Sequence, residues 1–362
     1  MDVPLIDGAS LRPLVLPARA DAADADEFRD LARVRNQVYS ELTGRDEQDL
    51  APDELLPLLR SGPDRTTLVW VVRHDGAVIG RAMVDIPQDQ GARSLIATIE
   101  LLPRAWGRGI GRAILPHLEA AARAHGRTVV QNWTEQQATD GPRLHAPTGY
   151  GSVPDDHVAR FLTRSGFTLE QVHRVSILDL HPRHGRRIRH LNDEARVRAR
   201  DYDLVSWMLP TPAEYLDGYA WMKSRMSTDA PSAGLDADEE RWDAARVRRM
   251  EAREHERGNT MLVTAARHRA TGALAAFTEL AIGRDRAATT HQNDTLVLRE
   301  HRGHRLGLLI KTAALLRWSG IAPESPRLIT YNAEENRPML SINEALGFTA
   351  RAHEGAWKKD LT

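Results

Sequence analysis

One short segment occurs twice in this chain, and the duplication limits the folds that the chain can adopt. Residues 101–115 read LLPRAWGRGIGRAIL, and residues 297–311 read VLREHRGHRLGLLIK. Each copy predicts a strand, a tight basic turn with glycines, and an amphipathic helix. A second shared motif follows each copy, FLTRSGF at 161–167 and INEALGF at 342–348. Two motifs in the same order predict a duplicated domain.

Each turn also predicts an anion-binding site. The first amides of a helix have no helical partners, and the helix dipole makes this end positive. In the first copy Gly107, Gly109 and Gly111 let an anion reach the backbone, while Arg108 and Arg112 add positive charge. The second copy has, in order, His301, Arg302, Gly303, His304, Arg305 and Gly307. A solvated turn is the alternative for one copy alone, but two copies in the same context favour a phosphate site.

Two common phosphate motifs do not match these turns. A Walker loop ends in Gly-Lys followed by Ser or Thr, and the chain has no such sequence. A dinucleotide turn requires a third glycine where the chain has Arg112. Neither motif accounts for the Gly-Phe endings at 166–167 and 347–348.

The turns and the Gly-Phe endings together resemble the GCN5-related N-acetyltransferase (GNAT) superfamily. The resemblance extends over about residues 12–358, in a tandem two-domain layout similar to that of mycothiol synthase. It implies an α/β (α+β) fold of two tandem GNAT-like domains, each a mixed, splayed β-sheet flanked by helices. Each copy departs from the family's turn once: Trp106 replaces its Gln or Arg, and Arg305 replaces its first glycine.

The resemblance implies that acetyl-CoA is the cofactor, with its pyrophosphate on the turns. It places the first cofactor site on Leu101, Leu102, Gly107, Arg108, Gly109, Gly111, Arg112 and Ala113. It places the second on Val297, Leu298, Arg302, Gly303, His304, Arg305, Gly307, Leu308, Asn332 and Asn336. The two asparagines are predicted to begin the last helix, either as N-caps or as ligands of the two amides in the pantetheine arm.

The order of predicted strands and helices sets the domain boundaries. We predict an N-terminal GNAT-like domain at 1–182, a basic linker at 183–190 and a C-terminal GNAT-like domain at 191–362. The second domain has a helical insert at 207–257, between its first and second strands. The family builds its acceptor wall there, so the insert is expected to shape an acceptor pocket.

Three carboxylates are candidates for the general base that acetyl transfer to an amine requires. Glu100 precedes a strand end, where burial would raise its pKa, although an edge carboxylate facing solvent is equally consistent with the sequence. Glu279 lies within the apolar strand predicted at 274–282, and Asp294 lies three residues before Val297. We expect the second domain to carry the reaction and the first to be mainly structural, with or without a retained cofactor.

The acid that protonates the leaving thiolate is not evident from the sequence. The resemblance expects a tyrosine five residues before the phenylalanine of Gly-Phe, but this position holds Leu162 in the first copy and Asn343 in the second. Tyr150 and Tyr331 are nearby substitutes, although packing is the default role of both.

Composition excludes several classes of function. The 362 residues include no cysteine, which excludes disulfides, thiolate catalysis and cysteine-bound metal, and we expect no metal site. The net charge of −1 gives no indication of nucleic-acid binding. No long apolar run or signal-like start is present, so we expect a cytoplasmic protein with no membrane association, as a monomer or homodimer.

The sequence thus predicts an acetyl-CoA-dependent N-acetyltransferase. The acceptor is the primary amine of a small molecule, which attacks the thioester directly. Two alternatives remain open: a non-catalytic, regulatory CoA-binding protein, because both acid tyrosines are absent, or an acyltransferase that uses a longer acyl-CoA or an amino-acyl donor.

Overall fold

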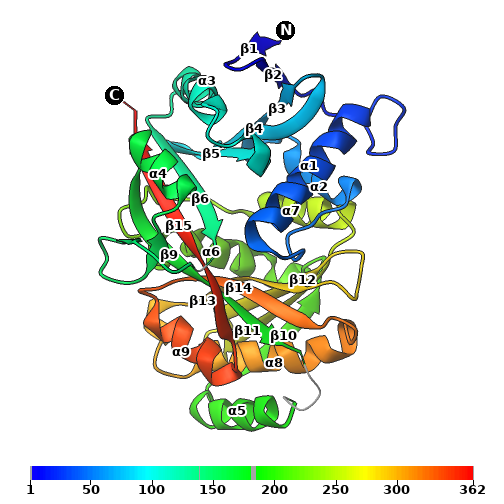
Figure 1. The fold of residues 1–362 in the computed structure, drawn as a ribbon. Coiled ribbons are helices and arrows are strands. Elements are labelled where there is room, and N and C mark those ends of the chain that lie inside the picture. The colour runs from blue at the N-terminus through cyan, green and yellow to red at the C-terminus, as the bar shows by residue number, and fades with distance from the viewer. Residues whose placement is uncertain (1, 138, 181–184, 362) are drawn as a thin grey trace. The chain divides into compact units, whose positions relative to one another are not determined.

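The computed structural model describes residues 2–137, 139–180 and 185–361, which form two compact units (Figure 1). The first unit comprises Met1–Val172, Ser232–Asp238 and His353–Thr362. The second unit comprises His173–Pro231 and Glu239–Ala352. The duplicated α/β architecture predicted from the sequence is confirmed.

The first unit contains the elements of the first half of the chain. In order they are β1 (Val3–Pro4), β2 (Ala9–Pro13), α1 (Asp26–Thr43), α2 (Pro52–Leu59), β3 (Arg65–His74), β4 (Ala77–Pro87), β5 (Ser94–Leu101), a 3-10 turn η1 (Pro103–Ala105), α3 (Ile110–Ala124), β6 (Val129–Gln136), β7 (Arg143–His145), β8 (Ser152–Pro154), α4 (His157–Arg164) and the start of β9 (Thr168–Asp179).

The second unit repeats this series, with α6 and α7 in the place of α1 and α2 and a further helix, α5, before its first strand. In order it contains the rest of β9, α5 (Gly185–Arg198), β10 (Tyr202–Met208), α6 (Ala213–Asp229), α7 (Ala244–Glu256), β11 (Thr260–His268), β12 (Leu274–Ile282), β13 (Thr290–Val297), the 3-10 turn η3 (Arg299–His301), α8 (Leu306–Ile321), β14 (Arg327–Ala333), α9 (Arg337–Leu346) and the start of β15 (Thr349–Asp360).

Both sheets are mixed, and each splays beside its glycine turn. In the first unit the strand order is β1-β2-β3-β4-β5-β6-β15, and the parallel pairing of β5 with β6 stops at Ile96. In the second unit the order is β9-β14-β13-β12-β11-β10, and the parallel pairing of β13 with β14 stops at His291. Beyond these residues the inner edges of β5 and β13 are not paired with the neighbouring strand. The predicted splay is therefore present in both units.

Each sheet is completed by a strand from the other half of the sequence. Residues His353–Asp360 of β15 pair with β6 in the first unit. Residues His173–Asp179 of β9 pair with β14 in the second unit. The boundaries predicted at 182 and 191 divide the chain into continuous segments, whereas the compact units are discontinuous.

Helices cover both faces of each sheet. In the first unit α1 and α2 contribute Phe28, Leu31 and Leu55 to one core, and α3 contributes Ile110 and Ile114 to the other. In the second unit the side chains of β12 alternate between the two faces, as in any strand. Phe277 and Ala281 pack with α6 and α7, whereas Ala276 and Leu280 pack with α8. We call these the α6/α7 face and the α8 face.

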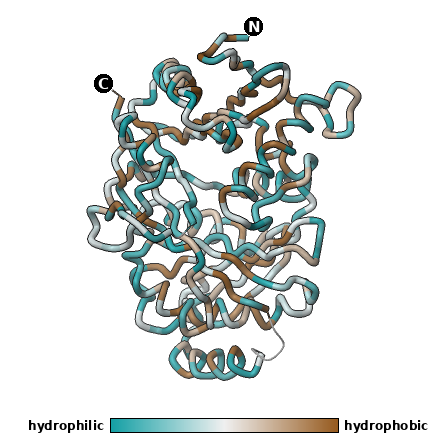
Figure 2. The backbone as a smooth tube through the Cα atoms, in the orientation of Figure 1, coloured by the Kyte–Doolittle hydropathy of each residue, from teal (hydrophilic) through white to brown (hydrophobic). Residues whose placement is uncertain are grey.

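Three local predictions need correction. Of the predicted linker 183–190, residues 185–190 begin α5, and 183–184 lie outside the described residues. Although α5 is largely hydrophilic (Figure 2), Ile188 and Ala195 are buried with α8. Residues 134–156, for which the sequence predicts a long loop, contain the end of β6 and the β7–β8 hairpin. Asn332 lies within β14 and does not begin a helix.

Candidate active site

The two glycine turns have the same backbone conformation. Gly107 and Gly303 have φ angles of +73° and +87°. Gly109 and Arg305, the N-caps of α3 and α8, are also left-handed, with φ angles of +80° and +55°. Arg305 therefore occupies the position of a glycine without changing the turn, although a side chain makes this conformation costly.

Both turns present free helix amides. The first helical hydrogen bond of α3 runs from Ala113 N–H to Gly109 O at 3.0 Å. The equivalent bond of α8 runs from Leu309 N–H to Arg305 O at 3.0 Å. The amides of 110–112 and 306–308 precede these bonds, so they have no helical acceptor and can bind an anion. The amide of Ala113, which was predicted to bind the cofactor, is already used within the helix.

The last glycine of each turn lies against a neighbouring helix. A Cβ atom on Gly307 would lie 2.8 Å from Cδ1 of Ile342 on α9. A Cβ atom on Gly111 would lie 3.4 Å from the ring of Phe161 on α4. Helix packing therefore requires a glycine at 307, and close approach of a phosphate at these two positions stays a prediction.

The departure at Trp106 preserves a hydrogen bond of the turn. Its Nε1 donates to the carbonyl of Leu101 at 2.8 Å. In the second unit Nε of Arg302 donates to the carbonyl of Val297 at 3.3 Å. Because both strand-end carbonyls accept from the turn, tryptophan can replace the arginine here.

The next residue at each strand end is bonded to the neighbouring strand. Leu102 N–H donates to Ile79 O at 2.9 Å, and Leu298 N–H donates to Ala275 O at 3.0 Å. Both leucine side chains are buried in the cores. Leu102 and Leu298, which were predicted to bind the cofactor, therefore fix the strand ends through the core and the neighbouring strand.

A cationic pocket adjoins the first turn. It has a volume of about 570 Å³ and lies between the turn and α4. Trp106 stacks on His157 with ring centres 3.8 Å apart. The arginines in its lining are Arg108, Arg112, Arg160 and Arg164. Arg108 is bonded to Asp7 and His74, so the predicted contribution of its charge is partly neutralised.

The side chains of the second turn contact their own unit. The Tyr202 hydroxyl and Nδ1 of His301 are 2.8 Å apart, and the ring of His304 lies 5.6 Å from that of Tyr202. Arg305 pairs with Glu194 on α5 at 3.4 Å. Leu308 is buried in the core, so its amide alone faces the predicted anion.

Glu100 is buried and held by Arg81, which corrects the solvent-facing alternative. Arg81 donates two hydrogen bonds to the carboxylate, and the Tyr39 hydroxyl donates a third at 2.8 Å. Burial opposes ionisation, but the Arg81 guanidinium outweighs it and lowers the pKa of Glu100 below 4.5. A carboxylate held in this way is a weak proton acceptor, so Glu100 does not fit the role of general base.

A bulge brings Glu279 and Asp294 together. Between β12 and β13 the register shifts after Thr278, which pairs with Thr295, while Leu280 pairs with Gln292. One residue of β12, Glu279, therefore faces two residues of β13, one of which is Asp294. Bulges are frequent beside active sites because they redirect side chains.

The environment of Glu279 suits a general base at neutral pH. The Tyr219 hydroxyl donates to its carboxylate at 2.6 Å, and Nζ of Lys223 lies 3.2 Å away. Lys223 also pairs with Asp294. Burial raises the pKa of Glu279 from 4.5 to about 7, against the opposing charge of Lys223. Neither Tyr219 nor Lys223 was predicted, because both come from α6, far from Glu279 in the sequence.

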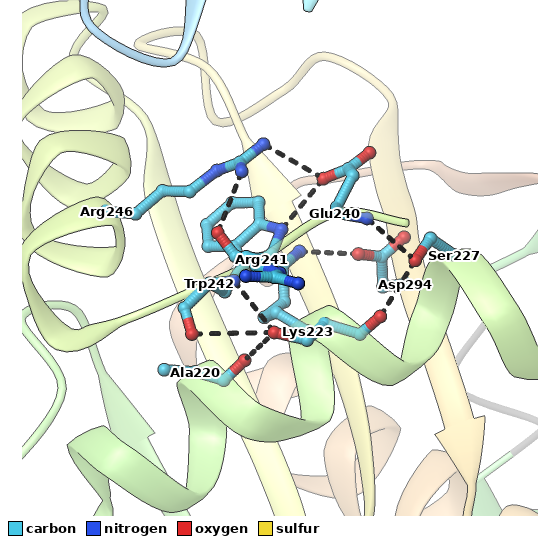
Figure 3. A network of polar contacts seen from close by, with 9 residues as sticks. Ala220, Lys223, Ser227, Glu240, Arg241, Trp242, Arg246 and Asp294 are labelled. Atoms are coloured by element: carbon cyan, nitrogen blue, oxygen red, sulfur yellow. Dashed lines mark hydrogen bonds and ion pairs between the residues drawn. The ribbon is translucent and has the colours of Figure 1, made fainter. Parts of the chain in front are cut away.

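Glu279 lines a pocket of about 540 Å³ on the α6/α7 face. Its wall includes Lys223, Trp242 and Asp294, and it extends to Gln292 of β13 and Tyr331 of β14, beside the splay. Figure 3 shows Lys223 reaching Asp294 close to Trp242. Helices α6 and α7 of the predicted insert line this pocket, whereas residues 207–208 of that prediction belong to β10.

The Trp242 ring is fixed by polar contacts. Its Nε1 donates to Glu240 at 2.8 Å (Figure 3), and its backbone N–H donates to Ser224 Oγ at 2.8 Å. The guanidinium of Arg246 lies 4.7 Å from the ring centre. A fixed aromatic ring gives the pocket a rigid apolar wall.

The first unit has no counterpart of this carboxylate pair. Ile79 and Ala275 accept equivalent hydrogen bonds from the two strand ends. Met83 lies four residues after Ile79, as Glu279 lies four residues after Ala275, so Met83 occupies the equivalent position. Thr98 lies four residues before the donor Leu102, as Asp294 lies four residues before the donor Leu298, so Thr98 occupies the position of Asp294. The two turns are thus alike, but only the second unit combines its turn with these two acids.

The predicted asparagines have partners within the second unit. The Asn336 side chain caps α9 by accepting from the Met339 amide at 3.4 Å. The Asn332 oxygen accepts from the Asn343 amide at 2.7 Å. Asn343 in turn accepts from Nζ of Lys311, a buried lysine that the sequence pattern did not single out.

Two kinds of functional feature are absent from residues 2–137, 139–180 and 185–361. No group of three His, Asp or Glu side chains in these ranges is arranged to hold a metal. No helix among these residues is long and apolar enough to cross a membrane.

Comparison with known proteins supports the family resemblance seen in the sequence. Residues 30–150 match the model of the acetyltransferase (GNAT) family. No curated protein matches the chain in sequence. A tandem GNAT protein from the clavulanic acid biosynthesis pathway has a TM-score of 0.73 and 26% identity, covering 97% of this chain and 98% of that one. Residues 30–150 therefore match the GNAT family, and the whole chain is similar to a tandem GNAT protein, which supports an acyl-CoA-dependent acyltransferase.

Two further structures share the fold. A GCN5-related N-acetyltransferase from Sphaerobacter thermophilus has a TM-score of 0.58 and 15% identity, with coverages of 98% and 96%. A GCN5-related glucosamine N-acetyltransferase region of a fungal multi-domain β-N-acetylglucosaminidase has a TM-score of 0.61 and 13% identity, with coverages of 98% and 38%. These two likenesses show the fold over nearly the whole length of the chain.

Proposed function

We propose that the protein transfers the acetyl group of acetyl-CoA to the primary amine of a small molecule, in its second unit. The observation that carries this proposal is the pocket in which Glu279 and Asp294 meet on the α6/α7 face. The pathway named for the tandem GNAT protein also supports a small-molecule acceptor.

The free amides of both turns fit the pyrophosphate of coenzyme A. In the second unit the amides of 306–308 bind the phosphates, and the pantetheine arm follows the unpaired edge of β13 toward Glu279. Val297, whose backbone faces this edge, is placed to polarise the thioester carbonyl. In the first unit the arginine-lined pocket retains the cofactor without a base beside it.

Glu279 is the proposed general base. The acceptor attacks the thioester carbon as a neutral amine, and Glu279 takes the one proton that its nitrogen loses as the amide forms. Asp294 and Lys223 hold the Glu279 carboxylate in place.

The test measures acetyl transfer to a panel of small amines by the wild-type protein, Glu279→Gln and Glu100→Gln. Glu279→Gln should lower kcat by about 10²-fold or more, as expected for loss of a general base. Glu100→Gln should stay within a few-fold of wild type, with thermal melting confirming that each variant is folded. Loss of activity only in Glu100→Gln would assign the reaction to the first unit.

The same experiment separates the alternatives. CoA binding without transfer to any amine would indicate a regulatory CoA-binding protein. Transfer from longer acyl-CoAs in preference to acetyl-CoA would identify a different acyl donor.

A further inference from the structure

Lys311 is a buried cation that the proposed function does not yet use. It projects from α8 and is only 1% exposed. Its Nζ donates to Gln292 Oε1 at 3.0 Å and to Asn343 Oδ1 at 2.7 Å. Both acceptors are neutral, and in the part of the chain that the structure describes no carboxylate is ion-paired to Lys311. A buried ammonium is costly, so its retention without a counter-ion points to a use for its proton.

The contacts of Lys311 cross the splay of the second sheet. Gln292 is the first residue of β13 beyond its pairing with β14. Asn343 on α9 is bonded to Asn332 of β14, which lies beyond the part of β14 that pairs with β13. The network Gln292–Lys311–Asn343–Asn332 therefore connects the two strands where they separate.

The proposed base and this lysine lie on opposite faces of the sheet. Glu279 is on the α6/α7 face with Tyr219 and Lys223, whereas Lys311 is on the α8 face. The turn that fits the phosphates of coenzyme A is on the α8 side, at the start of the same helix as Lys311. The splay is the place where an amine from one face can meet a thioester from the other.

We infer that Lys311 is the proton donor to the thiolate that leaves when the amine attacks. The inference rests on the proposed function of the second unit and names the general acid that protonates the leaving thiolate, which the sequence did not reveal. Asn343, at the position where the resemblance expects an acid tyrosine, has no acidic proton, and its oxygen instead orients the Lys311 ammonium.

The proton and electron balance closes without another reactant. The amine nitrogen forms a bond to the carbonyl carbon, Glu279 takes its proton, and the carbon–sulfur bond breaks with its electron pair on sulfur. The Lys311 ammonium gives one proton to this sulfur and becomes a neutral amine. Glu279 then releases its proton to water and Lys311 takes one from water, which leaves an amide and the free thiol of coenzyme A.

The acidity of Lys311 is consistent with this role. Burial lowers the pKa of its ammonium from 10.5 to about 7. A donor of this acidity is still charged at neutral pH and gives up its proton readily. Because Glu279 must be ionised and Lys311 protonated, activity should have a bell-shaped pH profile centred near pH 7.

The first test is kinetic and uses Lys311→Met, with Lys359→Met as the matched control. Lys359 lies 5.8 Å from the ring of Phe167 in the first Gly-Phe ending, much as Lys311 lies 5.9 Å from Phe348 in the second. Lys311→Met should lower kcat by about 10²-fold or more, lose the alkaline limb of its pH profile and bind CoA as wild type does in calorimetry. Turnover within a few-fold of wild type, or an unchanged alkaline limb, would overturn the inference.

The second test does not require activity. The chain has only four lysines, so carbon-13 labelling at lysine Cε gives four assignable signals, from Lys223, Lys311, Lys358 and Lys359. Adding CoA should shift the Lys311 signal and its titration, and desulfo-CoA should not reproduce the change. If CoA leaves the Lys311 signal unchanged, the inference is refuted even if acetyl transfer is observed. Absence of acetyl transfer in wild type, with the Lys311 shift present, would instead count against the proposed function.

Discussion

Replacing Lys311 by methionine should change how the stability of the protein depends on pH. Burial lowers the pKa of Lys311 from 10.5 to about 7 in the folded protein. Between these values the unfolded chain binds more protons than the folded one, so the stability of the wild type rises with pH. At about 1.4 kcal/mol per pKa unit, the buried charge costs about 5 kcal/mol below pH 7 and nothing above pH 10.5.

Methionine also removes two hydrogen bonds. The oxygens of Gln292 and Asn343 lose their donor, at a cost of about 1–3 kcal/mol each. This cost does not change with pH, so the informative quantity is the difference between variant and wild type as pH rises. The free energy of unfolding of the wild type, relative to that of the variant, should rise by about 3–4 kcal/mol between pH 7 and pH 10.

The assay is urea unfolding at pH steps from 6 to 10, with fluorescence of buried tryptophans such as Trp318 on α8 reporting on the second unit. Comparing variant and wild type at each pH cancels the titration of groups that both proteins share. Lys359→Met supplies the baseline for loss of a lysine elsewhere. A difference that stays constant from pH 7 to pH 10 would refute the claim that Lys311 is desolvated in the folded protein.

Two further predictions concern the glycine turns. Arg305→Gly should raise the stability of the protein by about 0.5–1 kcal/mol in thermal or urea unfolding, because it relieves a left-handed side chain at φ +55°. The neighbouring Arg302→Gly should lower stability by about 1 kcal/mol, because its backbone is extended and its hydrogen bond to Val297 is lost; equal effects would contradict the strain argument. Gly109→Val should weaken CoA binding in calorimetry at the first turn, because a β-branched residue disfavours φ +80°. Gly126→Val carries similar strain at φ +68° away from the pocket, so equal CoA affinities in these two variants would contradict the phosphate cradle.

The sequence predicted the parts of the site that are encoded locally. The glycine turns could be recognised because a left-handed N-cap and free helix amides depend on consecutive residues. Glu279 stood out because a carboxylate is unusual in the apolar strand Leu274–Ile282. Glu100 has a similar local context, and only the cross-strand position of Arg81 on β4 distinguishes it.

The parts that were missed depend on contacts between distant segments. Lys223 and Tyr219 reach Glu279 from a helix more than fifty residues earlier in the chain. The contacts of Lys311 come from β13 and α9, which local periodicity does not place around one atom. The pairing partners of β9 and β15 were also not predicted, because neither strand's own sequence specifies which edge it will join.

The exchange of strands between the two halves has a consequence for how the protein is made. The sheet of the first unit includes His353–Asp360, which are synthesised long after β6, with which they pair. During translation the edge of β6 that pairs with β15 therefore stays unpaired until β15 has left the ribosome. Open strand edges promote misassembly, so this interval is a vulnerable one. For the same reason neither half of the gene encodes a complete domain, and a polypeptide cut at the duplication boundary would lack one strand of its sheet.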